Sequence, residues 1–320
     1  MVLTEKDFFP KNYPAEISSG KVSASAPSNI ALVKYWGKYG EQFPKNASIS
    51  FTLNNCKTET TLHFEEKILT EKEFDFSVFF EGKENLAFEL KIRQFFERIV
   101  QYVPFLKEYS FRIETENTFP HSSGIASSAS GMAALALCLM KIEKQLLPEM
   151  SEEFFLQKAS FLARLGSGSA CRSIYDGLVV WGKHPEIPNS SNLYGTKYSK
   201  EVHEIFHQFC DVILLVDGGQ KKVSSSVGHA LMNDHPFAEA RFLQAENNLT
   251  SLQEILKSGD LTKFIERVES EALSLHAMMM TAKPYFLLIK PNTLKIIEKI
   301  WEFREQTGLH LCFTLDAGAN

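Results

Sequence analysis

The stretch that most constrains the fold is Pro120–Gly131, PHSSGIASSASG, because it runs directly into the apolar segment Met132–Met140. Small, flexible residues followed by an apolar run predict a loop that opens into a buried helix. The first turn of such a helix presents backbone N–H groups and the positive end of the helix dipole, which together suit a phosphate. Gly124 and Gly131 lack a Cβ atom, so an anion could approach the main chain closely.

The same segment also has an ordinary structural explanation. No Gly-Lys-Ser/Thr closes it as in a Walker A loop, and it lacks the GxGxxG fingerprint of dinucleotide-binding proteins. Its five serines could hold phosphate oxygens, but they could equally cap the helix that follows. A phosphate site and a Ser-rich N-cap on a core helix therefore both stay open from this segment alone.

The chain has 320 residues, enough for one large domain or two medium ones with a substantial core. A formal net charge of −5 and a pI near 6.0 argue against nucleic acid or a membrane surface as a partner. No apolar run approaches the roughly 20 residues that a membrane-spanning helix needs. Any phosphorylated ligand must therefore be held by a local cluster of cations and amide groups.

The cysteines indicate the cellular compartment. They are odd in number, dispersed and without a CxxC pair, which fits reduced thiols and disfavours a disulfide framework or a zinc site. The N-terminus carries charge and proline where a signal peptide needs an apolar core. We therefore expect a cytoplasmic protein. The five cysteines are Cys56, Cys138, Cys171, Cys210 and Cys312.

Strand-like and helix-like patterns occur in both halves of the chain, which predicts an α+β protein of two lobes. Proline and polar residues cluster in His184–Ser191, so we place the boundary near residues 185–195. The expected domains are a loosely ordered N-terminal arm over residues 1–20, an N-terminal lobe over residues 21–190 and a C-terminal lobe over residues 191–320.

The first lobe is expected to consist largely of strands. Period-2 alternation predicts strands between Lys21 and Phe80, including Ser48–Leu53 and Thr58–Phe64. Its other elements are a helix over Leu86–Val103, a strand over Phe111–Glu116, the helix after the serine loop and a helix that begins at Ser151. In the second lobe we expect a buried strand over Asp211–Val216, strands over Phe286–Ile289 and Leu311–Leu315, and helices over Phe237–Ser258, Leu261–Met280 and Thr293–Gln306.

Four polar clusters could carry chemistry. Lys34 and Lys38 bracket an aromatic pair, Arg172 follows a Gly/Ser turn, Lys221–Gly228 combines cations with hydroxyls, and Asp316 follows an apolar run. Each has an ordinary explanation as a solvated lysine, a surface arginine, a helix cap or a turn aspartate. Together, in an acidic chain, they fit a site that receives two polyanions. The sequence has no Cys/His metal spacing, and Mg²⁺ would bridge phosphate oxygens with few protein ligands.

Four segments, in this order, resemble the mevalonate diphosphate decarboxylases of the galactokinase, homoserine kinase, mevalonate kinase and phosphomevalonate kinase superfamily. They are NIALVKYWGK, the PxxSGIASSASG loop, GSGSACRS and the closing LDAGAN, and the resemblance runs from Ser25 to Asn320. It implies a two-lobed small-molecule-kinase-like fold with an active-site cleft between the lobes. It also implies ATP-dependent decarboxylation of mevalonate 5-diphosphate to isopentenyl diphosphate, with ADP, phosphate and CO₂ released, and a homodimer.

The resemblance also implies a set of site residues. The lobe over residues 21–190 then binds the nucleotide, with Mg²⁺ held mainly by the phosphates and no protein side chain assigned as a metal ligand. The catalytic residues are Lys34, Arg172 and Asp316, and Asp316 acts as a base or as an electrostatic partner of the 3-hydroxyl. The substrate-binding residues are Tyr35, Lys38, Ser167, Ser169, Arg172 and Ser225. The ATP-binding residues are Ser122, Ser123, Gly124, Ile125, Ala126, Ser127 and Ser128.

The chain departs from the family pattern at three places. Asp176 replaces a small residue, Ser226 stands where some bacterial members carry arginine, and relatives generally continue for several tens of residues beyond the turn at Asp316. The C-terminal lobe is therefore expected to be short relative to the family. Two alternatives stay open, namely a related kinase that phosphorylates a mevalonate-like alcohol without decarboxylation and a catalytically inactive nucleotide-binding regulator.

Overall fold

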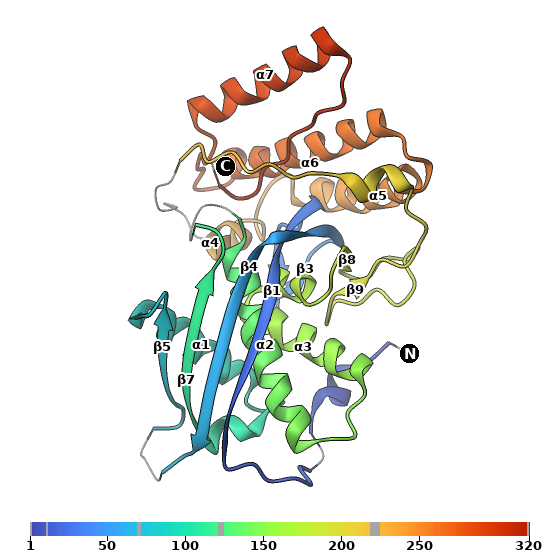
Figure 1. Cartoon of the computed structure of the whole chain (residues 1–320). Coiled ribbons are helices and arrows are strands. Elements are labelled where there is room, and N and C mark those ends of the chain that lie inside the picture. Colours follow the sequence, from blue (N-terminus) through green and yellow to red (C-terminus); the bar gives the residue numbers. More distant parts are fainter. Residues whose placement is uncertain (1, 11, 69–71, 121–124, 218–224, 319) are drawn as a thin grey trace.

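The computed structural model describes residues 2–10, 12–68, 72–120, 125–217, 225–318 and 320. Its central element is a mixed sheet, which has seven strands among these residues, in the order β6-β5-β7-β4-β8-β9 with β1 beside β4 (Figure 1). The strands are β1 (Ser19–Val33), β4 (Ser48–Glu66), β5 (Asp75–Phe80), β6 (Lys83–Glu84), β7 (Tyr109–Asn117), β8 (Leu178–Trp181) and β9 (Thr196–Lys197). A separate hairpin pairs β2 (Lys38–Tyr39) with β3 (Phe43–Pro44).

The long strand β4 organises this sheet. It pairs antiparallel with β1 along one side, while β7 and β8 share its other side. The side chains of β4 alternate between buried and exposed positions over much of its length, as the sequence predicted. The two segments expected as separate strands, Ser48–Leu53 and Thr58–Phe64, are parts of this one strand. The strand predicted over Phe111–Glu116 is β7, so strands are confirmed at these positions, whereas the expected break between Leu53 and Thr58 is wrong.

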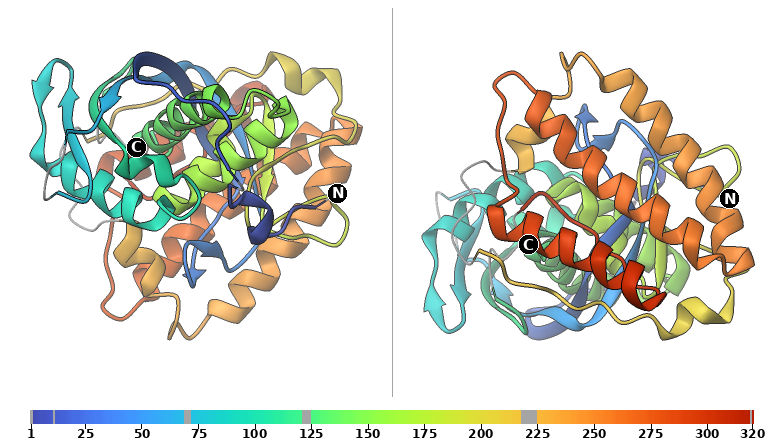
Figure 2. Two further views of the ribbon diagram at one scale, coloured as in Figure 1. Left: turned by 90° about the horizontal axis from the view of Figure 1, so that it is seen from below. Right: turned by 90° about the horizontal axis from the view of Figure 1, so that it is seen from above.

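Three helices build the largest core together with this sheet. The helix predicted after the serine loop is α2 (Ser127–Leu146), which contacts both β1 and β4. Small residues such as Ala133 and Ala134 let α2 approach closely, and both are fully buried. Beside it lie α1 (Leu86–Ile99) and α3 (Glu152–Gly166), which Ser151 caps as predicted (Figures 1 and 2).

The N-terminal arm is anchored, which differs from the loosely ordered arm expected from the sequence. A short 3₁₀ helix, η1 (Glu5–Phe8), inserts the fully buried Phe8 ring, which stacks on Phe161 with ring centroids 4.3 Å apart. Tyr13 donates a hydrogen bond of 3.0 Å to the buried Glu143. The arm therefore forms part of the core of the first half.

The second half of the described chain is helical. Its main helices are α5 (Ala238–Ser258), α6 (Leu261–Thr281) and α7 (Pro291–Thr307), which gather at the upper end of the molecule in Figure 1 and agree with prediction. A short helix, α4 (Ser225–Ala230), precedes them. Residues of α5 and α6 share a buried cluster with Leu32, Val33, Ile49 and Val180, so the core continues across the boundary region between the halves.

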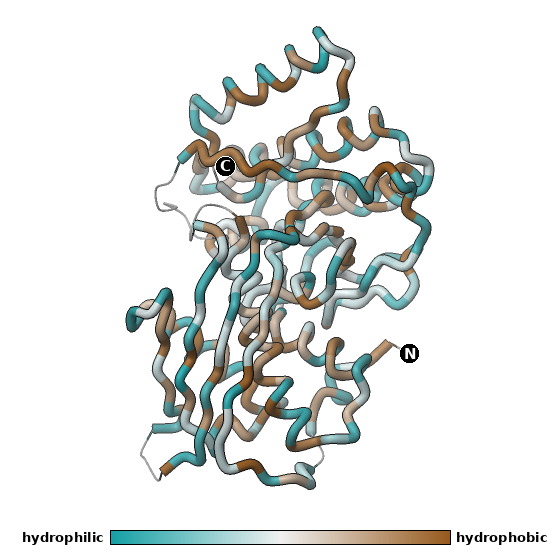
Figure 3. Tube along the Cα trace, in the orientation of Figure 1, coloured by the Kyte–Doolittle hydropathy of each residue, from teal (hydrophilic) through white to brown (hydrophobic). Residues whose placement is uncertain are grey.

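The three strands predicted for the second half are wrong. Residues 211–216, 286–289 and 311–315 are extended but have no strand pairing in the described structure. Instead of a buried strand, Asp211–Val216 is an exposed apolar segment, with Val212 74% exposed (Figure 3). An apolar run shows only that burial of a segment would be energetically favourable, whereas a strand also needs a neighbouring strand to complete its backbone hydrogen bonds.

Candidate active site

Lys34 lies immediately after β1, where the sheet meets the helices of the second half. Its side chain is only 1% exposed, and its Nζ donates a hydrogen bond of 2.9 Å to Thr314 Oγ1. Burial lowers the pKa of Lys34 to about 8, while the carboxylates of Asp316 and Glu271 oppose that shift. Lys34 therefore lies in the field of Asp316, the partner that the sequence predicted for it.

Arg172 forms the second part of the site, on the 3₁₀ helix η3 (Gly168–Ile174). It is buried, and its Nε donates to Ser50 Oγ at 2.9 Å and to Asn29 Oδ1 at 3.2 Å. Its Nη1 donates to Ser48 Oγ at 2.6 Å. Burial lowers the pKa of Arg172, whereas nearby groups including Asp316 and Tyr35 raise it. Three hydroxyl and amide contacts of the sheet strands β1 and β4 thus hold the guanidinium in one orientation beside Lys34 and Asp316.

A backbone irregularity explains how β1 supplies Asn29. The pairing of β1 with β4 shifts register between Pro27 and Asn29, which alters the direction of the side chains that follow. Asn29 Nδ2 donates to Ser173 Oγ at 2.7 Å and to the main-chain oxygen of Ser169 at 3.2 Å. Asn29 therefore links β1 to the Gly/Ser turn that carries Arg172.

Tyr35 packs against that turn. Its ring lies edge-on to Trp181, with centroids 4.7 Å apart. A Cβ atom on Gly168 would lie 3.0 Å from the Tyr35 hydroxyl and 2.7 Å from the Trp181 ring, so the turn needs glycine there. Ser167 and Ser169 flank Gly168 and are half-buried. These predicted substrate-binding residues therefore lie on the same short turn as Arg172.

The first turn of α2 is the candidate nucleotide-binding element. Ser128 is exposed and Ser127 half-buried, and Ala126 precedes the helix in a left-handed conformation. Ser28 donates a hydrogen bond to the main-chain oxygen of Ile125, and Ser28 adjoins the Arg172 contact Asn29. The remaining predicted members of this loop, Ser122, Ser123 and Gly124, lie outside the described residues.

The helix α4 brings a histidine that the sequence analysis missed. His229 is buried, its ring lies 4.2 Å from that of Tyr35, and its Nδ1 accepts a hydrogen bond of 3.0 Å from the N–H of Gly37. Burial lowers the pKa of His229 to about 3, and the nearby charge of Lys38 lowers it further.

Two further predicted substrate-binding residues are Lys38 and Ser225. Lys38 donates a hydrogen bond of 3.0 Å to Gln42. The backbone of Ser225 begins α4, and its side chain lies outside the described part.

The sequence suggested that Asp316 ends a strand. In the structure, Asp316 instead lies half-buried in a turn between the buried residues Leu315 and Ala317. The main-chain N–H of Gly318 donates to the Asp316 carbonyl at 2.7 Å. His276 Nε2 lies 3.1 Å from the same carbonyl oxygen. Side-chain contacts from α6, rather than pairing within a sheet, therefore fix this part of the site.

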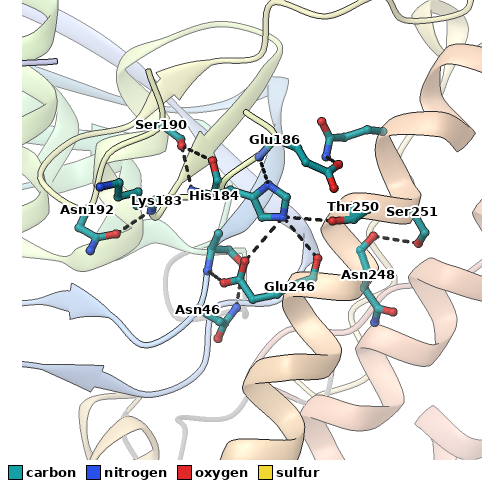
Figure 4. A network of polar contacts seen from close by, with 12 residues as sticks. Asn46, Lys183, His184, Glu186, Ser190, Asn192, Glu246, Asn248, Thr250 and Ser251 are labelled. Carbon is teal, nitrogen blue, oxygen red and sulfur yellow. Dashed lines mark hydrogen bonds and ion pairs between the residues drawn. The ribbon is translucent and has the colours of Figure 1, made fainter. Parts of the chain in front are cut away.

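A second polar network fixes the start of β4, the strand that carries Ser48 and Ser50 (Figure 4). Glu246 of α5 accepts a hydrogen bond of 2.8 Å from the Ala47 N–H. Its carboxylate also lies 3.6 Å from Nε2 of the buried His184. This network joins α5 to two segments of the first half, beside the strand that orients Arg172.

The described residues contain no group of three or more His, Cys, Asp or Glu side chains that could hold a metal ion. A magnesium ion carried by nucleotide phosphates needs few protein ligands, and the first turn of α2, where Ser128 is exposed and Ser127 half-buried, suits a phosphate group. Among the described helices, none combines the length and apolar character that crossing a bilayer requires.

Two family models match this chain. The N-terminal domain of diphosphomevalonate decarboxylase-like proteins matches residues 26–192, and the C-terminal domain of mevalonate 5-diphosphate decarboxylases matches residues 211–320. The chain belongs to the diphosphomevalonate decarboxylase family. The family and enzyme class predicted from the four sequence segments are thereby confirmed.

Individual members of the family agree with this assignment. The diphosphomevalonate decarboxylase of Debaryomyces hansenii is 30% identical, over 93% of this chain and 77% of that protein. The solved mevalonate diphosphate decarboxylase of Staphylococcus aureus is 29% identical, with a TM-score of 0.77 over 94% of this chain and 86% of that one. A further solved structure, in complex with MVAPP, AMPPCP and magnesium, is 28% identical, with a TM-score of 0.75 over 94% and 87%. The fold is that of these decarboxylases.

Several residues that build the site are not among the predicted site residues. Ser48 and Ser50 alternate on a buried strand, and two hydroxyls on one face of such a strand could have been recognised as facing a polar partner. Asn29 and His229 gave no such signal, because a register shift and a short helix place them. Glu271 and His276 lie on α6 among apolar residues, and only the folded structure brings them to Lys34 and Asp316.

Proposed function

We propose that this chain catalyses the ATP-dependent decarboxylation of mevalonate 5-diphosphate to isopentenyl diphosphate, with ADP, phosphate and CO₂ as the other products. The observation that carries this proposal is the arrangement of Lys34, Arg172 and Asp316. A buried guanidinium, oriented by three side chains, lies in the same electrostatic environment as a lysine and a carboxylate. A simple kinase for an alcohol would have less need for an arginine fixed in this way.

Asp316 and Lys34 act on the 3-hydroxyl of the substrate. A tertiary hydroxyl is a poor leaving group, so its oxygen is first phosphorylated by ATP. Asp316 orients or deprotonates this hydroxyl, and the charge of Lys34 stabilises the oxygen as it attacks the phosphoryl group. The support for these roles is that Asp316 raises the pKa of Lys34 against the effect of burial.

Arg172 holds the carboxylate that leaves as CO₂. Its Nε and Nη1 already donate to Asn29, Ser50 and Ser48, whereas Nη2 has no protein acceptor among the described residues. The outer edge of the guanidinium can thus meet a carboxylate while the sheet holds the inner edge. When the C3–O bond breaks, the electron pair of the bond to the carboxylate carbon forms the new double bond.

The first turn of α2 would hold the nucleotide. Ser127 and Ser128 lie in this turn, where the N–H groups of the helix and its dipole favour phosphate oxygens. Magnesium bound to those phosphates would neutralise their charge, and a solved relative in complex with AMPPCP and magnesium supports both ligands. The substrate contacts are Tyr35 and the Gly/Ser turn around Gly168.

The test is to measure CO₂ and ADP release from mevalonate 5-diphosphate and MgATP in the same reaction. We expect the two products in equal amounts. ADP without CO₂ would identify a kinase instead, and the absence of both would identify a catalytically inactive chain. Either of these outcomes contradicts the proposal.

We also propose that the protein is cytoplasmic and forms a homodimer. All five cysteines are free thiols, which supports a reducing compartment. The homodimer rests on the family resemblance alone. Fractionation of the native host and sedimentation of the purified protein test the two statements separately, and a secreted protein or a monomer at micromolar concentration would contradict them.

A further inference from the structure

A carboxylate on α6 contacts the catalytic lysine through its main chain. Glu271 is fully buried, and its Oε2 accepts a hydrogen bond of 2.8 Å from the N–H of Lys34. Arg241 of α5 donates to both oxygens of Glu271, at 3.0 and 2.6 Å, and Asn248 donates to one of them. Every oxygen of this buried carboxylate is therefore engaged, which gives it one defined position.

Two further hydrogen bonds hold Lys34 in place. Asn46, near the start of β4, donates a hydrogen bond of 3.0 Å to the main-chain oxygen of Lys34. At the other end of the lysine, Nζ donates to Thr314, two residues before Asp316. Glu271 and Asn46 thus fix the main chain of Lys34 on both sides, and the direction of its side chain follows from that.

The same helix also contacts the catalytic aspartate. His276 is 1% exposed, and its Nε2 lies 3.1 Å from the carbonyl oxygen of Asp316. Burial lowers the pKa of His276 to about 4, so the ring is neutral near pH 7. Because a carbonyl oxygen only accepts hydrogen bonds, the ring carries its proton on Nε2 and donates it to Asp316.

We propose that α6 sets the distance between Lys34 and Asp316, with Glu271 and His276 as positioning residues. Glu271 and His276 are five residues apart on this helix, a rise of about 7.5 Å that a regular helix keeps constant. Lys34 follows a strand of the first half, whereas Asp316 lies in a turn near residue 320, so neither segment by itself fixes their separation. This inference rests on the proposed function, because it assigns the roles of Lys34 and Asp316.

Glu271 also affects the charge of Lys34. The charged groups that act on Lys34 are Asp316, Glu271 and Asp211, which favour the ammonium form, and Arg172, which disfavours it. Glu271→Gln removes one of the negative charges that favour the ammonium form. Lys34 should therefore lose its proton at a lower pH in this variant.

The experiment compares Glu271→Gln with a matched control, Glu143→Gln. Glu143 is also fully buried, and it pairs with Lys158 at 2.5 Å in the core of the first half. Each substitution leaves one buried cation without its carboxylate, so both variants should be less stable. For Glu271→Gln alone, we expect kcat to fall at least tenfold and the alkaline limb of its pH profile to move to lower pH. An unmoved limb, or an equal movement in Glu143→Gln, would overturn the role of Glu271.

His276 offers an independent test that removes no buried charge. The amide of His276→Gln can still donate a hydrogen bond to the Asp316 carbonyl, whereas His276→Leu cannot. We expect His276→Leu to lose at least tenfold in kcat with little change in KM for MgATP, and His276→Gln to recover most of that loss. Equal kcat values for the two folded variants would overturn the role of His276.

These outcomes are distinct from a failure of the proposed function. A wild-type protein that releases no CO₂ from mevalonate 5-diphosphate contradicts the proposed function and the positioning roles with it. An active wild-type protein whose Glu271 and His276 variants behave like the controls contradicts the positioning roles alone.

Discussion

The two halves of this protein hold their parts of the active site in different ways. Arg172 is fixed by side chains of two sheet strands, β1 and β4, both within the first half. Asp316 lies in a turn of the second half, where the apolar segments around it form no sheet among the described residues, and the helix α6 contacts it instead. The comparison shows that a sheet can orient one candidate catalytic residue while a helix packed on that sheet contacts the other.

This contrast predicts that activity and stability depend on different residues. Substitutions in the core of the first half should lower the free energy of unfolding, because many buried groups depend on one another there. Substitutions at the turn that carries Asp316 should reduce turnover with little effect on stability. The following predictions test this separation, from the largest expected effect to the smallest.

The largest effect is expected for Asp316→Asn. Loss of a group that accepts or orients a proton costs about 10²–10⁴-fold in rate. Because Asp316 is half-buried in a turn, the variant should stay folded and bind MgATP with nearly wild-type affinity. Single-turnover CO₂ release and calorimetric titration of MgATP measure the two quantities. Near-normal CO₂ release would remove Asp316 from the mechanism.

Phe8→Ala should have a large effect on stability and little on chemistry. The ring is fully buried and stacks on Phe161, so its removal leaves a cavity that costs about 3–5 kcal/mol of unfolding free energy. Since Phe8 belongs to the core of the first half, kcat below the melting temperature should be unchanged. Urea denaturation followed by far-UV circular dichroism measures the loss. A loss below about 1 kcal/mol would mean that the arm is not docked.

Arg172→Lys should impair the reaction by an intermediate amount. An ammonium cannot reproduce the planar fork that contacts both the sheet and a carboxylate. Losing a charge-assisted contact costs about 1.5–3 kcal/mol, which corresponds to roughly 10–150-fold in kcat/KM for the diphosphate substrate. Arg164→Lys is the matched control, because Arg164 is equally buried but donates to main-chain oxygens of Glu41 and Leu193. A kcat/KM of Arg172→Lys within twofold of wild type would refute the assigned contact.

The same contrast explains how far the sequence alone could be interpreted. In β4, the period-2 alternation over Thr58–Phe64 made strand structure recognisable from the sequence, although the strand is longer than either predicted segment. Ser151 marked a helix start in the same direct way, since its side chain accepts a hydrogen bond from the first turn. The candidate catalytic residues could be found because they lie in short motifs.

What could not be predicted depends on contacts between distant segments. The apolar run DVILLV is as suitable for a strand as VVW in β8, but β8 lies between β4 and β9 whereas DVILLV has no strand beside it in the described structure. Likewise, a glutamate and a histidine on an amphipathic helix give no indication of what they contact. The partners of Glu271 and His276 are 237 and 40 residues away, and only the fold brings them together.

The smallest effect is expected for Val212→Ser, which tests the comparison most directly. Val212 is 74% exposed in the segment that was predicted to be a buried strand, so the substitution should change the unfolding free energy by no more than about 0.5 kcal/mol. Val78→Ser is the matched control, because Val78 is 1% exposed in β5 and its burial contributes about 1.5–3 kcal/mol. Chemical denaturation of both variants gives the two values. If Val212→Ser costs as much as Val78→Ser, the segment is covered in solution, which would contradict its exposed position and restore the prediction that it is buried.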